Sequence, residues 1–324
     1  MSEFRKIALV FPGQGSQEVG MGGAISERFS SAHETFEEAN EILRFDIRKL
    51  CVEGPEDELT LTKNSQPAIF ITSIACLRAL REAFPGMPLP AAAAGLSLGE
   101  FSAHVAAGTF SFADGLRLVR QRGEAMQDAC DKEPSTMASI VGLDLDTVRQ
   151  ICAMFQDRGV LDLGNLNCPG QIAISGSVEA VKAAMEEAEK RGAPKVVQLQ
   201  VSGAFHSRLM KPAEERLRQA VVDTKMVAPK YPVIANVSAL PVTDPDEIRE
   251  ALLKQLCSPV LWERSMRYLI DQGTSLFTEL GHGRVLRGLM RRIDKSQNVV
   301  NVQDPDSLEK ALDLFMSEEQ VTAH

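Results

Sequence analysis

Apolar residues along the chain follow two recurring patterns. Short continuous apolar runs predict buried strands, and segments in which apolar residues recur every three or four positions predict helices. The predicted strands of the main framework are "KIALVF" (6–11), "AAAAG" (91–95), "PVIANVS" (232–238), "SLFTEL" (275–280) and "NVVNV" (298–302). The predicted helices lie near residues 24–43, 67–83, 98–107, 112–130, 207–224, 246–256, 261–271, 284–294 and 306–317. This alternation favours an α/β fold with a mainly parallel sheet.

The segment from residue 137 to 201 departs from this alternation. Its predicted elements are, in order, strand "MASIVGL", helix "LDTVRQICAMF", strand "VLDLGNL", strand "QIAIS", helix "SVEAVKAAMEEAEKRG" and strand "KVVQLQV". The order βαββαβ is typical of ferredoxin-like folds. We therefore predict an inserted ferredoxin-like subdomain at 135–202 and a larger α/β domain formed by 1–134 and 203–324. A cleft between two such units is a common place for a ligand site.

Composition and charge narrow the class of protein. The chain has 324 residues, of which 44% are hydrophobic and 24% are charged, as in an ordinary globular protein with a substantial core. The formal net charge of −9 argues against general nucleic-acid binding. The first apolar run, Ile7 to Phe11, is too short for a signal peptide or a membrane span, so no membrane association is expected.

The cysteines indicate a reducing compartment. None of the six shows CxxC spacing or clusters with histidine. We therefore expect reduced, mostly buried thiols in a cytoplasmic protein, with no metal site. The six are Cys51, Cys76, Cys130, Cys152, Cys168 and Cys257.

Ser97 is a candidate nucleophile. It lies in Gly95-Leu96-Ser97-Leu98-Gly99, between the predicted strand "AAAAG" and an amphipathic helix, "LGEFSAHVAAG". A Gly-x-Ser-x-Gly elbow needs small flanking residues, because the serine backbone is strained and the helix crosses close to the strand. The Leu98 N–H would then be the natural donor to an oxyanion. The alternative is a chance match, since the five-residue pattern is common.

The loop "FPGQGSQ", residues 11–17, follows the first strand. It is rich in glycine, but Glu18 stands where G-x-G-x-x-G requires a third glycine, and no Walker lysine is present. Both nucleotide-binding interpretations therefore fail. The loop could supply a second oxyanion donor, with Gln14 as the candidate, or its glycines could serve only a tight turn.

Arg122 interrupts the apolar face of a predicted helix. On a helical wheel it falls in the middle of an arc formed by Phe112, Gly115, Leu116, Leu118, Val119, Gly123, Ala125, Met126 and Ala129. A charge in such a position is costly unless it is paired. Its partner is either an internal carboxylate or, failing that, a substrate carboxylate that the guanidinium binds with two hydrogen bonds.

A serine nucleophile also requires a general base, and two histidines qualify. His206 in "VSGAFHS" follows the last strand of the predicted insert, and His282 in "ELGHG" follows a late strand. The order Ser97, then Asp244 or Asp246, then His282 would be that of an α/β-hydrolase. His206 would instead need another group to orient its imidazole, such as a backbone carbonyl. The residues alone leave the choice open.

Seven motifs in one order resemble a known family. They are "FPGQGSQ", "NSQPAIF", "GLSLGEFSA", "RLVRQRGEAMQ", "NLNCPGQIAISG", "VSGAFHS" and "QLCSPVLWERSM". This set is similar to that of malonyl-CoA–acyl carrier protein transacylases and of the related acyltransferase domains of polyketide synthases. The resemblance extends from residue 7 to about residue 290. It implies an α/β-hydrolase-like domain with a ferredoxin-like insert.

The resemblance also implies roles for individual residues. Ser97 would carry the malonyl group as an ester, and His206 would be the base that activates first this serine and then the acceptor thiol. Gln14 and the Leu98 N–H would form the oxyanion hole. Arg122 would bind the free carboxylate of the malonyl group.

Four further positions match or depart from the family pattern. Gln255 corresponds to a family glutamine near the catalytic centre, where a backbone carbonyl orients the histidine. Asn165 corresponds to an asparagine that lines the cleft, and Phe205 to the version associated with malonyl rather than methylmalonyl selection. Leu96 is a departure, because the family usually has histidine before the nucleophile. That histidine is not the catalytic base, so we expect activity to survive.

The implied activity is transfer of malonyl from a coenzyme A thioester to the phosphopantetheine thiol of acyl carrier protein, supplying fatty-acid elongation without a cofactor. The protein is expected to be a monomer, and its acidic partner could dock near Arg284, Arg287 and Arg291, although these cations also suit a solvated helix end. Three alternatives are a trans-acting polyketide-type acyltransferase, an esterase or thioesterase using Ser97 and His282, and a non-catalytic module that binds carrier protein.

Overall fold

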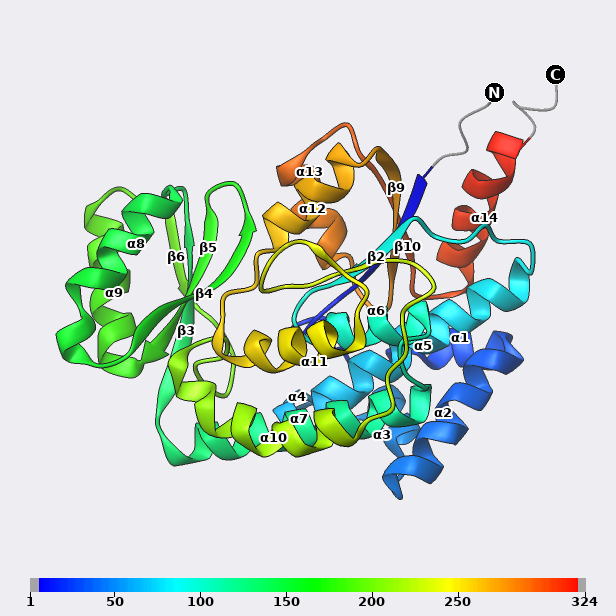
Figure 1. The fold of residues 1–324 in the computed structure, drawn as a ribbon, viewed down its shortest axis with the longest axis horizontal. Coiled ribbons are helices and arrows are strands. Elements are labelled where there is room, and N and C mark those ends of the chain that lie inside the picture. The colour runs from blue at the N-terminus through cyan, green and yellow to red at the C-terminus, as the bar shows by residue number, and fades with distance from the viewer. Residues whose placement is uncertain (1–5, 320–324) are drawn as a thin grey trace.

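A six-stranded sheet forms the centre of the computed structural model, which describes residues 6–319 (Figure 1). Its strand order is β10-β9-β1-β2-β7-β8. The strands are β1 Lys6–Phe11, β2 Ala92–Gly95, β7 Val233–Ile234, β8 Pro241–Val242, β9 Thr274–Leu280 and β10 Asn298–Val302. All neighbours pair in parallel except β7 and β8, which are antiparallel. The five predicted framework strands are therefore present, and the short β8 adds an edge strand that the pattern did not indicate.

Alternate residues of β1 enter two different cores. Ile7, Leu9 and Phe11 belong to a large core that also contains residues of α2 Ser30–Leu43, α5 Thr62–Ala83, α6 Gly99–Ala107 and α7 Phe112–Lys132. Ala8 and Val10 face a smaller core with α12 Trp262–Asp271 and α13 Val285–Ile293. A strand buried on both faces by helices reads as a continuous apolar run, which is the pattern that "KIALVF" shows.

The remaining helices of the large unit surround these layers. They are α1 Gly23–Arg28, α3 Ile47–Glu53, α4 Glu56–Thr60, α10 Lys211–Asp223, α11 Pro245–Lys254 and α14 Pro305–Glu319. The helix predicted at 24–43 is in fact two helices, because Phe29 between them has an extended backbone (φ −118°, ψ 126°). Helices α3 and α4 are too short to give a clear periodicity, and the sequence did not predict them.

Helix α5 begins five residues before the predicted start, although it contains Pro67. Proline removes the hydrogen bond to the carbonyl four residues earlier, here that of Lys63. The Arg120 Nη1 atom donates to that carbonyl at 2.9 Å and so replaces the missing donor. A partner from another helix thus allows α5 to continue through the proline.

Residues 135–198 form a separate four-stranded sheet, seen with its two helices at the left of Figure 1. Its elements are β3 Ser135–Val141, α8 Leu145–Met154, β4 Leu161–Cys168, β5 Gln171–Ser177, α9 Val178–Lys190 and β6 Lys195–Gln198. The strand order is β4-β5-β3-β6 with antiparallel neighbours, and the predicted βαββαβ order is confirmed. Val260, in the segment before α12, joins β4 by hydrogen bonds to Gly164 and Leu166.

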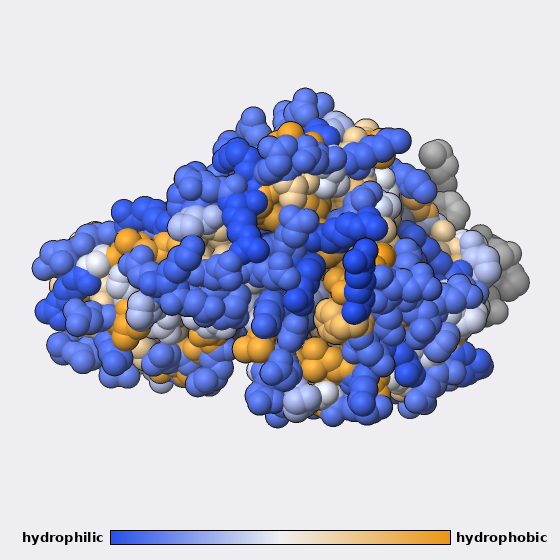
Figure 2. All heavy atoms as spheres, turned by 90° about the horizontal axis from the view of Figure 1, so that it is seen from below, coloured by the Kyte–Doolittle hydropathy of each residue, from blue (hydrophilic) through white to orange (hydrophobic). Residues whose placement is uncertain are grey.

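The surface and the thiols are those of an ordinary globular chain. Hydrophilic residues cover most of the face that Figure 2 shows, and hydrophobic ones gather in small separate patches. Within residues 6–319, none of the helices has the length and apolarity needed to cross a bilayer. All six cysteines are free, and five of them are buried.

Strand β2 and helix α6 cross at a distance that excludes side chains. A Cβ atom at Gly95 would lie 1.8 Å from the backbone of Gly99, and one at Gly99 would lie 2.2 Å from the Phe11 carbonyl oxygen. On the other side, a Cβ atom at Gly13 would lie 2.4 Å from the Leu96 carbonyl oxygen. The turn between β2 and α6 is therefore held against the end of β1 and the loop that follows it.

We predict that Gly99→Ala lowers the free energy of unfolding by about 1–3 kcal/mol or more, because backbone atoms must move to admit the methyl group. Gly288→Ala is the matched control, since a Cβ atom added to this helical glycine would have nothing within 4 Å. The control should be stabilised by about 0.5–1 kcal/mol through helix propensity. Urea denaturation measures both, and an unchanged midpoint for Gly99→Ala would contradict the close crossing.

Candidate active site

Ser97 occupies a strained turn between β2 and α6. Its φ of +52° lies in the left-handed region, which costs a non-glycine residue about 1–3 kcal/mol. Two side-chain amides hold this backbone: the Ser97 N–H donates to Asn236 Oδ1 at 2.7 Å, and the Ser97 carbonyl accepts from Gln255 Nε2 at 2.9 Å. The turn exposes the serine hydroxyl above the end of the sheet, as the elbow interpretation predicts.

His206 is the histidine that meets this hydroxyl. Its Nε2 atom lies 2.7 Å from Ser97 Oγ, and its Nδ1 atom lies 2.8 Å from the Gln255 carbonyl oxygen. A carbonyl only accepts, so Nδ1 carries the proton and Nε2 offers its lone pair to the serine hydroxyl. This tautomer is the one required for general-base catalysis. His206 also has a left-handed backbone, with φ of +61°.

The surroundings of His206 keep its imidazole neutral. Burial, followed by the positive charge of Arg122, lowers its pKa from 6.5 to about 4, against a smaller raising effect of the Gln255 carbonyl. An unfolded histidine binds a proton near pH 6.5, so the neutral folded imidazole favours folding above that pH. This contribution is lost as the pH falls through about 4. At neutral pH the base is therefore ready to accept a proton.

Arg122 is almost completely buried, with 1% of its surface exposed. Its Nη2 atom donates to Ser97 Oγ at 3.0 Å and to Gln255 Oε1 at 2.9 Å, and Nη1 donates to Gln66 Oε1 at 2.7 Å. Among the described residues no carboxylate forms an ion pair with it, so the internal salt bridge that the sequence allowed is absent there. Burial lowers its pKa from 12.5 to about 10, and the charge of Glu100 partly offsets this. The guanidinium remains charged at neutral pH.

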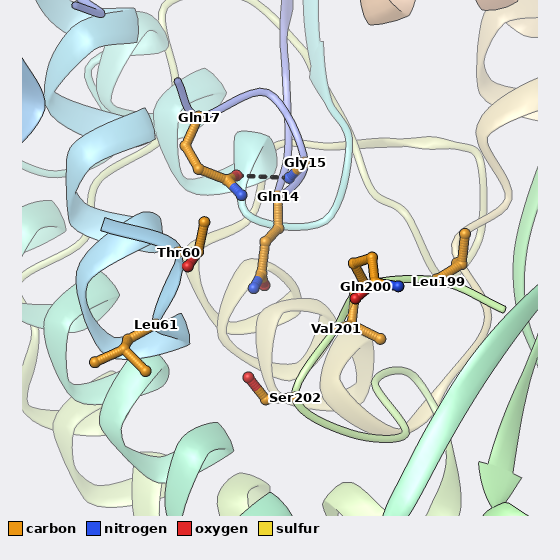
Figure 3. Close-up of a pocket in the computed structure, with 9 residues that line it drawn as sticks. All are labelled: Gln14, Gly15, Gln17, Thr60, Leu61, Leu199, Gln200, Val201 and Ser202. Carbon is orange, nitrogen blue, oxygen red and sulfur yellow. Dashed lines mark hydrogen bonds between the residues drawn. The ribbon is translucent and has the colours of Figure 1, made fainter. Parts of the chain in front are cut away.

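A cavity of about 700 Å³ lies beside Gln14. Figure 3 shows the side chain of Gln14 pointing into it from the loop after β1, with Thr60 and Leu61 on one side and 199–202 on the other. Gln14 Nε2 donates to Thr62 Oγ1 at 3.3 Å, which lies 3.2 Å from Ser202 Oγ. Three distant segments thus meet at this cavity.

The Leu98 N–H lies at the start of α6, directly after the serine, and has no hydrogen-bond partner in the part of the chain that the structure describes. It is available to an oxyanion, as the elbow interpretation requires. The loop that carries Gln14 packs against the same turn through Gly13 and Leu96.

Two other predicted residues lie in different surroundings. Phe205 is buried, and its carbonyl accepts from Ser175 Oγ of β5 at 2.6 Å, which ties the histidine segment to the small sheet. Asn165 is in β4 and bridges to Val260 through its backbone. In the structure of residues 6–319, the Asn165 side chain forms no hydrogen bond with Ser97, His206 or Arg122.

The residues of the alternative triad are dispersed. His282 Nε2 lies 3.0 Å from Glu18 Oε2. Asp244 caps α11 by accepting from the N–H groups of Asp246 and Glu247, and Asp246 pairs with Arg249. The hydrolase arrangement of Ser97 with His282 is therefore wrong.

The structure adds three polar residues that sequence analysis did not single out. Gln66, Glu100 and Asn236 are all at least 99% buried, and each donates to or accepts from the cluster around Ser97. Glu100 and Asn236 interrupt mostly apolar stretches, as Arg122 does, whereas Gln66 follows the polar first residues of α5. The wheel argument applied to α5 and α6 could have found the first two, whereas Asn236 follows a strand of only two residues.

The fold and site define an enzyme class with an activated serine, and comparison with known proteins identifies the family. A family model described as "Acyl transferase domain" matches residues 8–320. The "Malonyl CoA-acyl carrier protein transacylase" of Bacillus subtilis is 43% identical over 314 residues, covering 97% of this chain and 98% of the relative. The chain therefore belongs to the acyl transferase family.

Two further matches come from polyketide systems. The "Polyketide biosynthesis protein ThaF" of Burkholderia thailandensis is 44% identical over 286 residues, which are 88% of this chain and 24% of that protein. A solved structure described as "PlMCAT:AntF (holo): type II PKS acyl-carrier protein in complex with its malonyl-transacylase" is 37% identical with a TM-score of 0.92. It covers 95% of this chain and 99% of the other.

Proposed function

We propose that this enzyme transfers a malonyl group from malonyl-CoA to the phosphopantetheine thiol of an acyl carrier protein, and so supplies fatty-acid elongation. The observation that carries the proposal is Arg122, a buried guanidinium 3.0 Å from Ser97 Oγ whose hydrogen-bond partners are all neutral. An acyl group that ends in a carboxylate would supply the missing charge, and malonyl has this form. The similarity to the malonyl CoA-acyl carrier protein transacylase of Bacillus subtilis supports the same substrate.

In the first step Ser97 Oγ attacks the thioester carbonyl of malonyl-CoA while its proton passes to His206 Nε2. The C–S bond breaks as the tetrahedral intermediate collapses, and coenzyme A leaves as a thiol with the proton from His206. In the second step His206 takes the proton of the carrier protein's thiol, whose sulfur attacks the serine ester. Ser97 regains its proton and the malonyl group leaves on the carrier.

The oxyanion of each intermediate would be bound by the Leu98 N–H and by Gln14. Each donor of this kind is worth about 10²–10³ in rate. The pantetheine arm of either thioester would occupy the cavity of about 700 Å³ beside Gln14. Phe205, next to the base, would limit space at the α-carbon and disfavour methylmalonyl, and Asn165 would line the outer part of the cleft. Ser97 and His206 complete this chemistry without a metal or cofactor.

We also propose that residues 135–202 are an inserted ferredoxin-like subdomain in an α/β-hydrolase-like domain of 1–134 and 203–324. The separate antiparallel sheet supports this division.

Free cysteines support a cytoplasmic location. All the proposed catalytic groups come from one chain, as suits a monomer. Leu96, which replaces the usual histidine, packs against the core that contains residues of α12 and α13.

The second candidate is the same transfer in a polyketide pathway. The similarity to ThaF and to the type II polyketide transacylase favours it. The chemistry at Ser97 is identical in both pathways, and the carrier protein alone distinguishes them.

Mixing the protein with malonyl-CoA should give an adduct of one malonyl group in intact-protein mass spectrometry. Ser97→Ala should show no adduct, because it lacks the nucleophile. His206→Ala should slow acylation strongly, whereas His282→Ala should not. Addition of holo acyl carrier protein should discharge the adduct onto the carrier. Free malonate with no carrier product would contradict a transferase.

We predict that Arg122→Ala loses malonyl transfer while acetyl transfer is kept or gained. In the wild type, acetyl leaves the buried guanidinium without an anion, a penalty of about 3–5 kcal/mol that the variant removes. Comparing kcat/KM for malonyl-CoA and acetyl-CoA measures this. Equal losses on both substrates would show that Arg122 does not select the carboxylate.

The carrier protein is proposed to dock near Arg284, Arg287 and Arg291, which are exposed at and along α13. Arg284 and Arg287 also line a cavity of about 290 Å³ together with Lys310, Asp304 and Asp306, so the cavity itself is of mixed charge. The helix dipole would explain Arg291, which lies in the last turn of α13, but it disfavours cations at Arg284 and Arg287, which lie at the start of the helix.

We predict that Arg287→Glu raises the KM for an acidic carrier protein several-fold and leaves acylation by malonyl-CoA unchanged, because Arg287 lies on the surface. Steady-state assays at low and high salt measure this, with Arg149→Glu on α8 as the control for a change of surface charge. If the carrier KM of Arg287→Glu is normal and still rises with salt, docking takes place elsewhere.

A further inference from the structure

Glu100 is a fully buried carboxylate in the first turn of α6, three residues after the proposed nucleophile. Its Oε2 atom accepts from Gln255 Nε2 at 2.6 Å and from the Asn236 backbone N–H at 3.1 Å. Nothing in the transfer reaction itself uses this group. A buried carboxylate is expensive, and an apolar residue of similar size would suit the core better if packing were its only role.

Both partners of Glu100 hold the strained Ser97 backbone. Asn236 Oδ1 accepts the Ser97 N–H, and Asn236 Nδ2 donates to the Gly95 carbonyl at 2.7 Å. Gln255 Nε2 donates to the Ser97 carbonyl as well as to Glu100. One carboxylate oxygen therefore binds the side-chain amide of Gln255 and the backbone N–H of Asn236, the two residues whose side chains hold Ser97 from its two sides.

The carboxylate is one of three groups that fix which way the Gln255 amide faces. Glu100 Oε2 and the Ser97 carbonyl both accept from Nε2, at 2.6 and 2.9 Å, and Arg122 Nη2 donates to Oε1 at 2.9 Å. The bond to Glu100 is the shortest of the three. Gln255 also uses its backbone carbonyl to orient His206. Gln255 thus contacts the nucleophile, the base and the guanidinium, and Glu100 is the partner that holds its amide from the side away from the reacting groups.

The electrostatics of the pocket agree with this geometry. Burial raises the pKa of Glu100 to about 7, and the Gln255 and Asn236 hydrogen bonds and the charge of Arg122 oppose the rise. Its second oxygen, Oε1, is buried and has no partner among the residues that the structure describes. All the specific contacts of the carboxylate therefore pass through Oε2.

We propose that Glu100 is a positioning residue of the transfer reaction: through Oε2 it orients the Gln255 amide and the Asn236 backbone, and these place Ser97 and Arg122. The inference rests on the proposed function. It predicts that the ability to accept two hydrogen bonds at this point matters more than the negative charge.

Three variants of Glu100 distinguish the effect of an accepting oxygen at this position from the effect of the negative charge. Glu100→Gln keeps an accepting oxygen at the same distance without the charge, Glu100→Asp keeps the charge but withdraws it by one methylene, and Glu100→Ala removes both. Glu279→Ala is the matched control. Glu279 is also a buried carboxylate with two backbone donors, Leu286 N and Arg287 N at 2.9 Å, and burial raises its pKa to about 7 as well.

Rapid-quench mass spectrometry of acylation by malonyl-CoA gives both the rate and the final fraction of acylated protein. We expect Glu100→Ala to acylate about 10²-fold more slowly than wild type yet reach full stoichiometry, since small displacements of reacting groups cost rates of this order. Glu100→Gln should stay within about 10-fold of wild type, and Glu100→Asp should be slower than Glu100→Gln. The control should acylate at the wild-type rate even if its melting temperature falls.

A double variant tests whether Glu100 acts through Gln255. If it does, Glu100→Ala combined with Gln255→Ala is no slower than the slower single variant, whereas independent effects multiply. If Glu100→Ala does not fold, the order of the Gln and Asp variants carries the test.

Three outcomes would overturn the inference. They are wild-type rates in every Glu100 variant, equal losses in Glu100→Gln and Glu100→Ala, and slow acylation that merely follows the folded fraction, as shown by an equal loss in Glu279→Ala. Failure of the wild type to form any adduct would instead overturn the proposed function.

Discussion

The close crossing of β2 and α6 is the constraint on which the rest of the site depends. Glycines at 95 and 99 let the helix begin directly against the strand, and Gly13 brings the loop after β1 against the same turn. The chain can reverse in so little space only if Ser97 takes a left-handed backbone, which points its hydroxyl away from the sheet. The alanines of β2 follow from the same crowding, although alanine is a poor strand former.

A single buried cation governs the electrostatics around that hydroxyl. Arg122 contributes to the low pKa of His206, so the positive charge helps to keep the base neutral. The guanidinium is hydrogen-bonded by neutral groups that fix its position, and the nearby Glu100 carboxylate offsets only part of its charge. A site with this arrangement favours anionic acyl groups and has a usable base at neutral pH.

Much of the framework could be predicted from the sequence because burial leaves a pattern of apolar residues, continuous in the buried strands and periodic in the helices. The strands, the βαββαβ insert and the isolated charge on the apolar face of α7 all come from such patterns. The choice between His206 and His282 could not be predicted, because it depends on where the segment after β6 lies relative to Ser97. A backbone carbonyl such as that of Gln255 has no residue type to reveal it, and the resemblance to a family supplied this point.

Other misses have local causes. The break at Phe29 leaves the helical periodicity nearly intact, so the sequence does not show it. Pro67 is tolerated only because Arg120, far away in sequence, supplies a donor to the Lys63 carbonyl. The sequence does not single out Glu100, because a glutamate in the first turn of a helix is usually explained by the helix dipole.

The place of β1 in the sheet has a consequence for how the protein is made. Leu9 pairs with Ala93 on one side and with Thr278 on the other, so the first strand lies between partners about 84 and 269 residues away. During synthesis β2 is available early, but one edge of β1 stays open until β9 has left the ribosome. Such late long-range pairing slows folding. Until it occurs, the unpaired backbone N–H and C=O groups of β1 can pair with another chain. Ser97 and Arg122 are therefore synthesised long before β9 can pair with β1 and complete the central sheet.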